Sequence, residues 1–492
     1  MELPKSGRRG FLAGVAATGL AAPAVSERKA RPVFDVTGFG ASGDGSKPDT
    51  AAIQRAIDTC AQAGGGAVLF PPGRFLSGAL ELKSNVELRL EAGATLLGSK
   101  TLADYPSRIP ALRSYTDNYT ERSLLYAEKA QNIAIQGLGT IDGQGAAFEG
   151  PYKQRPYLVR FIECRNVTVC GVTFLNSPMW VQHYLACEGV RIQGVRVQSR
   201  VNRNNDGIDI DSCDRVSISD CEISSGDDAI VLKSTSDRPC RNVVISNCVL
   251  SSACNALKLG TESNGGFSNI AIANCAIYDT RLAGVALETV DGGALERVSV
   301  ANVVMDGVGA PVFMRLGNRA RPFREGGPKP GVGSFRDVTL RDIQAVRCGP
   351  VGCAIAGLPG HWIEHLTLSN LRLRFAGGGA AALAYRGIPE EEDKYPEFKM
   401  FGDLPAFGLY CRHVRGLRIE GLETGFESSE YRPAVVMEDV ERAWVHNCRA
   451  LNPMERFLLV RSGRGITLAH NDFVGVSQPA EGPGIWEFDN RR

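Results

Sequence analysis

The stretches "RVSISDCEI" (residues 215–223) and "NVVISNCVL" (residues 242–250) carry the pattern that decides the fold. Apolar and polar residues alternate in both, which is typical of a strand with one buried face. Similar segments lie on either side, and the first apolar positions of six successive segments are 23, 26, 27, 27 and 28 residues apart, at Val167, Val190, Val216, Val243, Ile270 and Val298. Such a nearly constant spacing indicates stacked units that bury a core only against their neighbours.

The repeated units show strand periodicity and no helical periodicity, so we predict an all-β fold, a single-stranded parallel β-helix. Equivalent positions should then stack from coil to coil as interior columns. One column lies three residues before each first apolar position: Cys164, Cys187, Cys213, Cys240, Phe267, Leu295, Phe335 and Ile363. A second lies five residues after it: Val172, Val195, Cys221, Cys248, Cys275, Val303, Ile343, Leu371 and Leu422.

These columns also assign most of the 14 cysteines. Thiols alternate there with Val, Leu and Phe, so we predict a buried ladder of free cysteines that act as small apolar residues. Disulfides are the default in an exported protein, and a few remain open elsewhere in the chain. A polar column, Asp220, Asn247, Asn274 and Asn302, falls where the chain must turn and is predicted to be structural.

One segment near the N-terminus has helical spacing. "KPDTAAIQRAIDTCAQAGGG" (residues 47–66) places Ile53, Ala56, Ile57 and Cys60 on one face, after a capping Asp49 or Thr50. We predict a short helix that ends at Gly64 and covers the open end of the core.

The first residues have the pattern of an export signal. "SGRRGFLAGVAATGLAAPAVS" (residues 6–26) has the pair Arg8-Arg9, an apolar stretch and a small-residue site near Ala24, and resembles a twin-arginine signal. The apolar stretch is short for a membrane anchor, which is the alternative. We expect residues 1–24 to be the signal and the mature protein to be periplasmic or secreted.

The net charge is +1 over 492 residues, so the composition shows no excess of positive charge of the kind that binds nucleic acid or a membrane surface.

Three carboxylates are predicted to meet on one face. Asp227 and Asp228 open an apolar run in "SSGDDAIVLKSTS" (residues 224–236), and Asp206 opens the run one coil earlier. If Ile208, Ile230 and Leu257 stack, then Asp206, Asp228 and Asn255 form one column, with coils about 4.8 Å apart. Close carboxylates push their pKa values apart, as an acid and base pair for glycoside hydrolysis requires. A solvated turn or a calcium site is the alternative.

These motifs resemble those of the polygalacturonases, family 28 of the glycoside hydrolases. Asn204-Asn205-Asp206 is similar to its Asn-Thr-Asp motif, and Gly226-Asp227-Asp228 matches its Asp-Asp motif. The stretches at residues 39–57 and 64–96 also look like the family's opening. The resemblance implies a right-handed, pectin-lyase-like β-helix over residues 33–480. It also implies hydrolysis with inversion, Asp227 being the acid while Asp206 and Asp228 activate water.

Two family motifs are not matched. Cys254-Asn255-Ala256 stands where the family has Gly-His-Gly, and Ala286-Leu287-Glu288 stands where it has Arg-Ile-Lys, which holds a galacturonate carboxylate. The lost cations argue against plain polygalacturonate as substrate. Lys258, Lys233, Arg315 and Arg319 could rebuild a carboxylate site. The expected substrate-contacting residues are Asn255, Lys258, Glu262, Glu288, Trp180 and His183.

We therefore expect an exported, monomeric enzyme for a pectic or related plant polysaccharide, without a cofactor or metal. Two other functions stay open. A polysaccharide lyase on the same fold would need calcium and a base, and no Arg or Lys stands out beside the aspartates. A non-catalytic carbohydrate-binding β-helix would not need all three aspartates.

Overall fold

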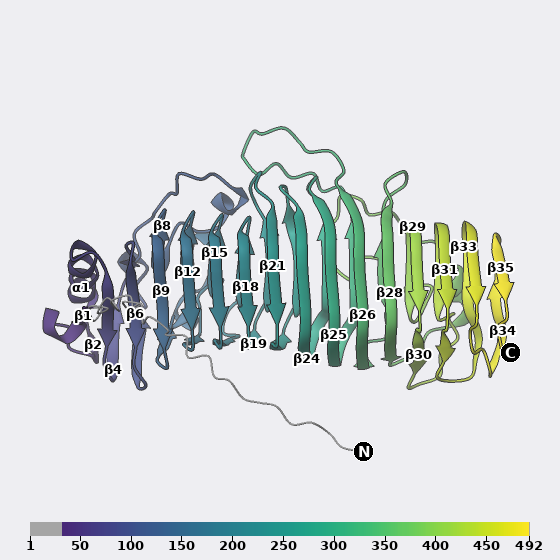
Figure 1. The fold of residues 1–492 in the computed structure, drawn as a ribbon, viewed down its shortest axis with the longest axis horizontal. Coiled ribbons are helices and arrows are strands. Elements are labelled where there is room, and N and C mark those ends of the chain that lie inside the picture. Colours follow the sequence, from purple (N-terminus) through teal and green to yellow (C-terminus); the bar gives the residue numbers. More distant parts are fainter. Residues whose placement is uncertain (1–31, 492) are drawn as a thin grey trace, which may run out of the picture. The chain divides into compact units, whose positions relative to one another are not determined.

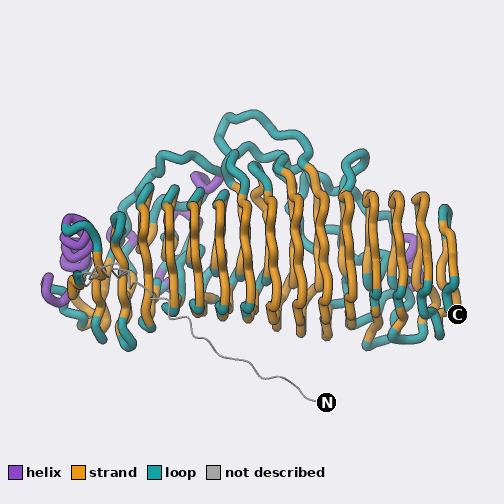
Figure 2. Tube along the Cα trace, viewed as in Figure 1, coloured by secondary structure: helices purple, strands orange, loops and turns teal. Residues whose placement is uncertain are grey.

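The computed structural model describes residues 32–491, so the predicted export signal at residues 1–24 lies outside the described residues. The described chain winds into stacked coils, and the strands of each coil pair in parallel with those of the neighbouring coils (Figures 1 and 2). This is the predicted all-β fold, and the right-handed parallel β-helix is confirmed. Within this range no helix combines the length and the apolar character that crossing a bilayer requires.

Parallel pairing between successive coils defines the three faces. Face A begins with β1 (Val33–Asp35), β3 (Gly66–Phe70), β6 (Val86–Leu90), β9 (Gln131–Gly137), β12 (Arg165–Cys170), β15 (Glu188–Gln193), β18 (Asp214–Ser219) and β21 (Cys240–Ser246). Face B begins with β2 (Asp44–Pro48), β4 (Gly73–Ser77), β7 (Ala94–Gly98), β10 (Thr140–Asp142), β13 (Thr173–Leu175), β16 (Arg196–Ser199), β19 (Glu222–Ser225) and β22 (Val249–Ser252). Face C begins with β5 (Leu80–Glu81), β8 (Ser123–Glu128), β11 (Tyr157–Ile162), β14 (Gln182–Leu185), β17 (Ile208–Asp211), β20 (Ile230–Ser234) and β23 (Leu257–Ser263).

Farther along the chain, single strands bend through more than one face. The long strands are β24 (Phe267–Thr289), β25 (Ala294–Leu316), β26 (Ser334–Cys348), β28 (Ile363–Phe375), β29 (Leu409–Glu420), β31 (Val435–His446) and β33 (Met454–Ala469). Shorter strands complete these coils: β27 (Cys353–Ala356), β30 (Glu423–Phe426), β32 (Arg449–Ala450), β34 (Val476–Glu481) and β35 (Ile485–Phe488).

The interior columns stack as predicted. Every side chain of the two columns is at most 2% exposed. Ile208 pairs with Ile230, which pairs with Leu257, so the register that aligns the carboxylates is confirmed. None of the 14 cysteines, all of which lie in the described range, forms a disulfide.

The polar column stacks by amide hydrogen bonds at the turn between faces A and B. Asn247 donates to Asp220 at 3.2 Å, Asn274 to Asn247 at 3.3 Å, and Asn302 to Asn274 at 2.8 Å. The backbone at these four positions is left-handed, with φ between 52° and 58°. Asn and Asp tolerate this conformation better than other residues with a side chain, so the column is structural, as predicted.

The capping helix is also confirmed, as α1 (Thr50–Gln62), with Ile53, Ala56, Ile57 and Cys60 buried against the first coils. Asp49 precedes it but does not cap it with its side chain. Its carboxylate instead accepts hydrogen bonds from the backbone of Ser42 and Gly43.

Four long connections leave the coil pattern, and all adjoin face C. They are loop 99–122 before β8, loop 143–156 before β11, loop 317–333 after β25 and loop 376–408 before β29. In Figure 1, loops 99–122 and 317–333 project beyond the upper ends of the strands. The short 3₁₀ helices are η1 (Val36–Phe39), η2 (Leu102–Asp104), η3 (Tyr115–Asn118), η4 (Gly145–Ala147), η5 (Tyr152–Gln154) and η6 (Ala381–Tyr385).

Candidate active site

A cavity of about 320 Å³ opens on face C above β14, β17, β20 and β23. All three predicted carboxylates line it, together with Lys233, Glu262 and Trp180. The remaining lining residues come from chain segments flanking the strands: Tyr115, Asn118, Tyr119, Tyr152, Asn204, Arg319, Arg321 and Tyr395.

The carboxylates are brought together because they occupy the same place in successive coils. Asp206 lies just before β17, and Asp228 lies just before β20. The Gly207 amide donates to the carbonyl of Asp228 at 2.9 Å, and the Ala229 amide donates to that of Asn255 at 2.9 Å. The column Asp206, Asp228 and Asn255 is therefore formed, as the sequence register predicts.

The pKa of Asp227 is shifted in the direction that a proton donor needs. Burial, followed by the neighbouring Asp228 carboxylate, raises the pKa of Asp227 above its ordinary value. One of its oxygens accepts the Asp228 amide at 2.9 Å, and the other faces the side-chain amide of Asn204 at 3.4 Å. A carboxyl group that keeps its proton to higher pH beside the cavity is suited to general acid catalysis.

The pKa of Asp228 is shifted in the opposite direction, downward. Burial opposes ionisation of Asp228, but the Lys258 ammonium at 3.2 Å, with Lys233, outweighs it and lowers the pKa. Asn255 adds two hydrogen bonds to the same carboxylate oxygen, from its side-chain amide at 2.8 Å and its backbone at 3.1 Å. Two adjacent residues thus carry pKa shifts of opposite sign, which separates an acid from a base.

Asp206, for which the resemblance implies a share in activating water, has a pKa shifted in the opposite direction from that of Asp228. Burial raises the pKa of Asp206 well above the usual range, and the nearby Asp209 and Asp227 add to the effect. Its Oδ1 has no hydrogen-bond partner among the described residues, and the Lys233 ammonium lies 3.5 Å from Oδ2. Asp228 is therefore the carboxylate of the column whose pKa its surroundings lower.

Lys233 links most of the buried charges of the cavity. Its ammonium lies 3.5 Å from Asp206, 3.6 Å from Asp209 and 3.6 Å from Glu262, and 4.6 Å from the ring centre of Trp180. Glu262 also accepts from Tyr119 at 3.1 Å and pairs with Arg321 at 3.2 Å. Despite burial, Lys233 and Arg321 hold the pKa of Glu262 well below its usual value.

Four of the six residues predicted to contact substrate do not line the cavity. Asn255 and Lys258 are at most 5% exposed and bind the Asp228 carboxylate instead.

His183 is fully buried, with Nε2 3.1 Å from Asp211 and its ring stacked on Tyr157. Burial lowers the pKa of His183, so the ring is favoured as neutral. The expectation that His183 lies on the groove is wrong, because its outward position on β14 is roofed by Trp180, whose ring centre is 5.1 Å away.

Glu288 is likewise 1% exposed and does not line the cavity. It lies 3.8 Å from Lys258 and accepts from Thr261 at 3.2 Å, and burial raises its pKa to about 7. Lys258 does lie beside Ala286 on the next strand, as predicted, but Ala286 is buried under loop 376–408. Arg315 turns away from the cavity to backbone carbonyls at Gly357 and Glu390.

The sequence analysis missed the aromatic wall and one cation of the cavity. Tyr119 packs against Tyr152 and Trp180 with ring centres 4.9 and 5.1 Å away. The Arg321 guanidinium lies 4.7 Å from the ring centre of Tyr115. The missed residues Tyr115, Tyr119, Tyr152 and Arg321 lie in loops 99–122, 143–156 and 317–333, which carry no repeat, so the coil period could not single them out.

The same cluster offers a possible set of metal ligands. Ligand atoms of Asp227, Asp228 and Cys254 lie within 4.8 Å of one another. Asp228 is already paired with Lys258 at 3.2 Å. The expectation of no metal therefore stays a prediction.

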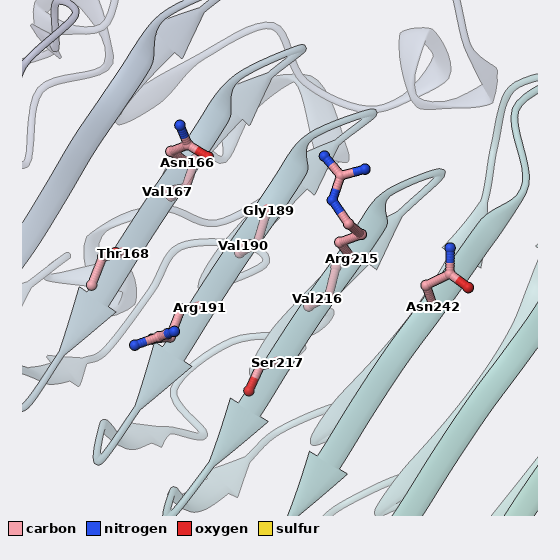
Figure 3. A pocket seen from close by; sticks show the side chains of 10 residues that line it. All are labelled: Asn166, Val167, Thr168, Gly189, Val190, Arg191, Arg215, Val216, Ser217 and Asn242. Atoms are coloured by element: carbon pink, nitrogen blue, oxygen red, sulfur yellow. The ribbon is translucent and has the colours of Figure 1, made fainter.

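A second hollow, of about 500 Å³, lies on face A (Figure 3). Its labelled side chains come from neighbouring coils and include Asn166, Arg191, Arg215 and Asn242. No carboxylate lines it, so it lacks the acid and base of the face C cavity.

Comparison with known proteins identifies the family of this chain. The model of "Glycosyl hydrolases family 28" matches residues 60–384. A probable polygalacturonase of Vitis vinifera is 36% identical over 214 residues, which cover 40% of this chain and 43% of the relative. An exo-poly-alpha-D-galacturonosidase of Dickeya chrysanthemi is 44% identical over 121 residues, covering 23% of this chain and 20% of the relative.

The matched segment thus spans less than half the length of these relatives. Among solved structures, a family 28 exopolygalacturonase of Yersinia enterocolitica has the same fold, with a TM-score of 0.68 and 21% identity over 84% of this chain and 78% of that one. With the family model matching well over half of the sequence, the chain belongs to family 28 of the glycosyl hydrolases.

Proposed function

We propose that the protein is an inverting glycoside hydrolase that cleaves a pectic or related plant polysaccharide. The observation that carries the proposal is the adjacent pair of Asp227 and Asp228, whose pKa values shift in opposite directions at the floor of a cavity. Family membership and the polygalacturonase relatives support the same chemistry.

In the proposed reaction, Asp227 gives its proton to the glycosidic oxygen as the bond from that oxygen to the anomeric carbon breaks. Asp228 takes a proton from a water molecule while the water oxygen bonds to the anomeric carbon from the opposite face. Inversion is proposed on family membership, because oxygens of Asp227 and Asp228 lie within 4.8 Å of each other, closer than the about 6.5–9.5 Å usual for inverting pairs. The products are a free alcohol and a sugar of inverted configuration. Asp206, which faces Lys233, is proposed to orient the water rather than to remove its proton.

We also propose that plain polygalacturonate is a poor substrate. The Arg and Lys of the family motif are replaced by Ala286 and Glu288, and both positions are buried. Lys233 and Lys258 already form ion pairs with carboxylates of the protein, Asp206 and Asp228. Arg319 lines the cavity and forms no ion pair among residues 32–491, so a single cation remains for a uronate.

Comparing kcat/KM on polygalacturonate and on rhamnose-containing pectic oligosaccharides tests this substrate proposal. The loss of one charge-assisted contact costs about 1.5–3 kcal/mol, or about 10- to 100-fold in kcat/KM. We expect at least that preference for the neutral-sugar linkage. A clear preference for unsubstituted polygalacturonate would contradict the proposal.

The reaction class has its own test. Hydrolysis should produce new reducing ends without the ultraviolet absorbance of an unsaturated uronate, and it should persist after a calcium chelator is added. Unsaturated product, or loss of activity with the chelator, would assign the protein to the lyases or to metal-assisted chemistry at Asp227, Asp228 and Cys254.

Export by the twin-arginine route and a monomeric state are proposed on the sequence alone. Changing Arg8 and Arg9 together to Lys should keep the protein in the cytoplasm, which fractionation of cells would detect. Light scattering of the mature protein gives its mass in solution, and a dimer mass would contradict the second proposal.

A further inference from the structure

Face C is covered on the N-terminal side of the cavity. The outward side chains of β8, β11 and β14 next to it are Tyr126, Arg160 and His183, and each is at most 5% exposed. Loop 99–122 lies over them, because Arg160 donates to the carbonyl of Thr120 at 2.9 Å and Leu112 packs against the apolar cluster that contains Tyr126. No open groove therefore continues along the strands in this direction.

Face C is covered on the C-terminal side as well. The outward residues of the four strands after β23 are Ala286, Phe313, Ala354 and Tyr410, all 0% exposed. They form one apolar cluster with residues of loop 376–408: Ala384, Ile388, Phe398, Phe401, Leu404 and Ala406. This loop fills the strip in which a longer substrate would lie.

The covering loops are fixed to the cavity itself. Loop 99–122 extends to the end of β20, where the Tyr115 amide donates to the carbonyl of Thr235 at 2.8 Å, and its Tyr119 donates to Glu262 at 3.1 Å. On the opposite side Tyr395 of loop 376–408 accepts from Lys258 at 3.3 Å, and its ring centre lies 5.1 Å from the Arg319 guanidinium. Both walls thus meet the residues that surround the carboxylates.

From this enclosure we infer that the cavity takes only the end of a polysaccharide chain and releases short products from it. The inference rests on the proposed glycoside hydrolase function. An internal linkage could reach Asp227 only if the polymer ran on along face C in both directions, and both directions are closed. A cavity of about 320 Å³ lies at the lower end of the range for small-molecule sites, so one or two sugar units fit.

End-labelled pectic oligosaccharides of defined length test the inference with the full-length mature protein. We expect the first products to be a mono- or disaccharide from one end and a chain shortened by that unit, with little early loss of viscosity on polymer. A spread of internal fragments at early times would overturn the inference while leaving the hydrolase function intact. No cleavage of any pectic substrate would instead count against the proposed function and remove the basis of the inference.

Two tyrosine variants test whether loop 376–408 determines the length of the products. Tyr395 is 53% exposed, so Tyr395→Ala should fold. We expect KM for the short oligosaccharides to rise about five- to tenfold, as for truncation of an aromatic contact residue, and some longer products to appear. Tyr385→Ala is the control, since Tyr385 is an exposed tyrosine of the same loop that does not line the cavity. Equal effects of the two variants would contradict a role for Tyr395 at the chain end.

Discussion

The two hollows on faces A and C are built from the same coils, yet they provide opposite environments. On face A, the outward side chains Arg191 and Ser217 stand in solvent beside their neighbours in the stack. On face C, the outward Asp209, Lys233 and Lys258 are at most 5% exposed, because long loops roof the strands. The coil sets which residues are neighbours, and the loops decide whether their charges stay screened by water.

This contrast predicts that equal substitutions have very unequal effects on the two faces. Asp227→Asn removes the proposed acid and should lower kcat by about 10²- to 10⁴-fold, with little change in stability. Asp214→Asn, beside the face A hollow, should leave kcat unchanged, because its carboxylate contacts Asn242, Arg241 and Arg215 on that face and no described residue of face C. Rate measurements on the best pectic substrate decide this, and near-full activity of Asp227→Asn would exclude it as the acid.

Replacing a buried cation on face C should likewise change stability and pH dependence far more than replacing an exposed cation on face A. Lys258→Met leaves Asp228 and Glu288 buried without their ammonium partner, which should cost about 3–5 kcal/mol of unfolding free energy. Lys258 contributes to the lowered pKa of Asp228, so its loss raises that pKa and moves the acid limb of the kcat/KM profile to higher pH.

The exposed Arg191→Met on face A is the control for Lys258→Met. It should change neither the melting temperature nor the pH profile. An unshifted acid limb in a folded Lys258→Met protein would show that Asp228 is not the titrating base.

Asp209 provides a smaller test, in which the variant should be the more stable protein. Burial raises the pKa of Asp209 well above its ordinary 3.8; Lys233 opposes this shift, and Asp228, Asp211 and Asp227 reinforce it. The folded state therefore holds a proton that the unfolded chain releases above pH 3.8, and stability falls as pH rises toward the folded pKa.

Asp209→Asn should remove this loss, since an amide does not ionise. We expect the variant to gain about 1–3 kcal/mol over the parent at pH 8 and less at pH 4. Denaturant titrations at the two pH values measure the difference. A gain that is the same at both values would mean that ionisation of Asp209 does not set the pH dependence.

The smallest effect is expected on the solvent-exposed turn column. Asn274→Ala removes hydrogen bonds to Asn247 and Asn302 and leaves alanine at φ 57°. We expect a loss of about 1–2 kcal/mol of unfolding free energy and an unchanged kcat. Thermal unfolding and kcat measured on one preparation check both statements, and a lost kcat would mean that the column acts on face C.

The fold and the carboxylates could be predicted because both follow the coil period. Ile208, Ile230 and Leu257 repeat in register, so the residues just before them must stack. The strand period also gives the outward direction of His183 and Glu288, but not their exposure, since that depends on what lies above them. Contacts such as Tyr119 with Glu262 join residues 143 positions apart through a loop without any period. No local pattern encodes such a contact.

The buried cysteines allow the opening of individual coils to be measured by thiol labelling. Cys164, Cys187, Cys213 and Cys240 belong to four successive coils, and each is at most 1% exposed. A thiol-reactive probe can reach such a group only when its coil opens, so the labelling rate of each cysteine measures the opening free energy of that coil. Mass spectrometry of partly labelled protein would then show, without any introduced label site, which coils separate first.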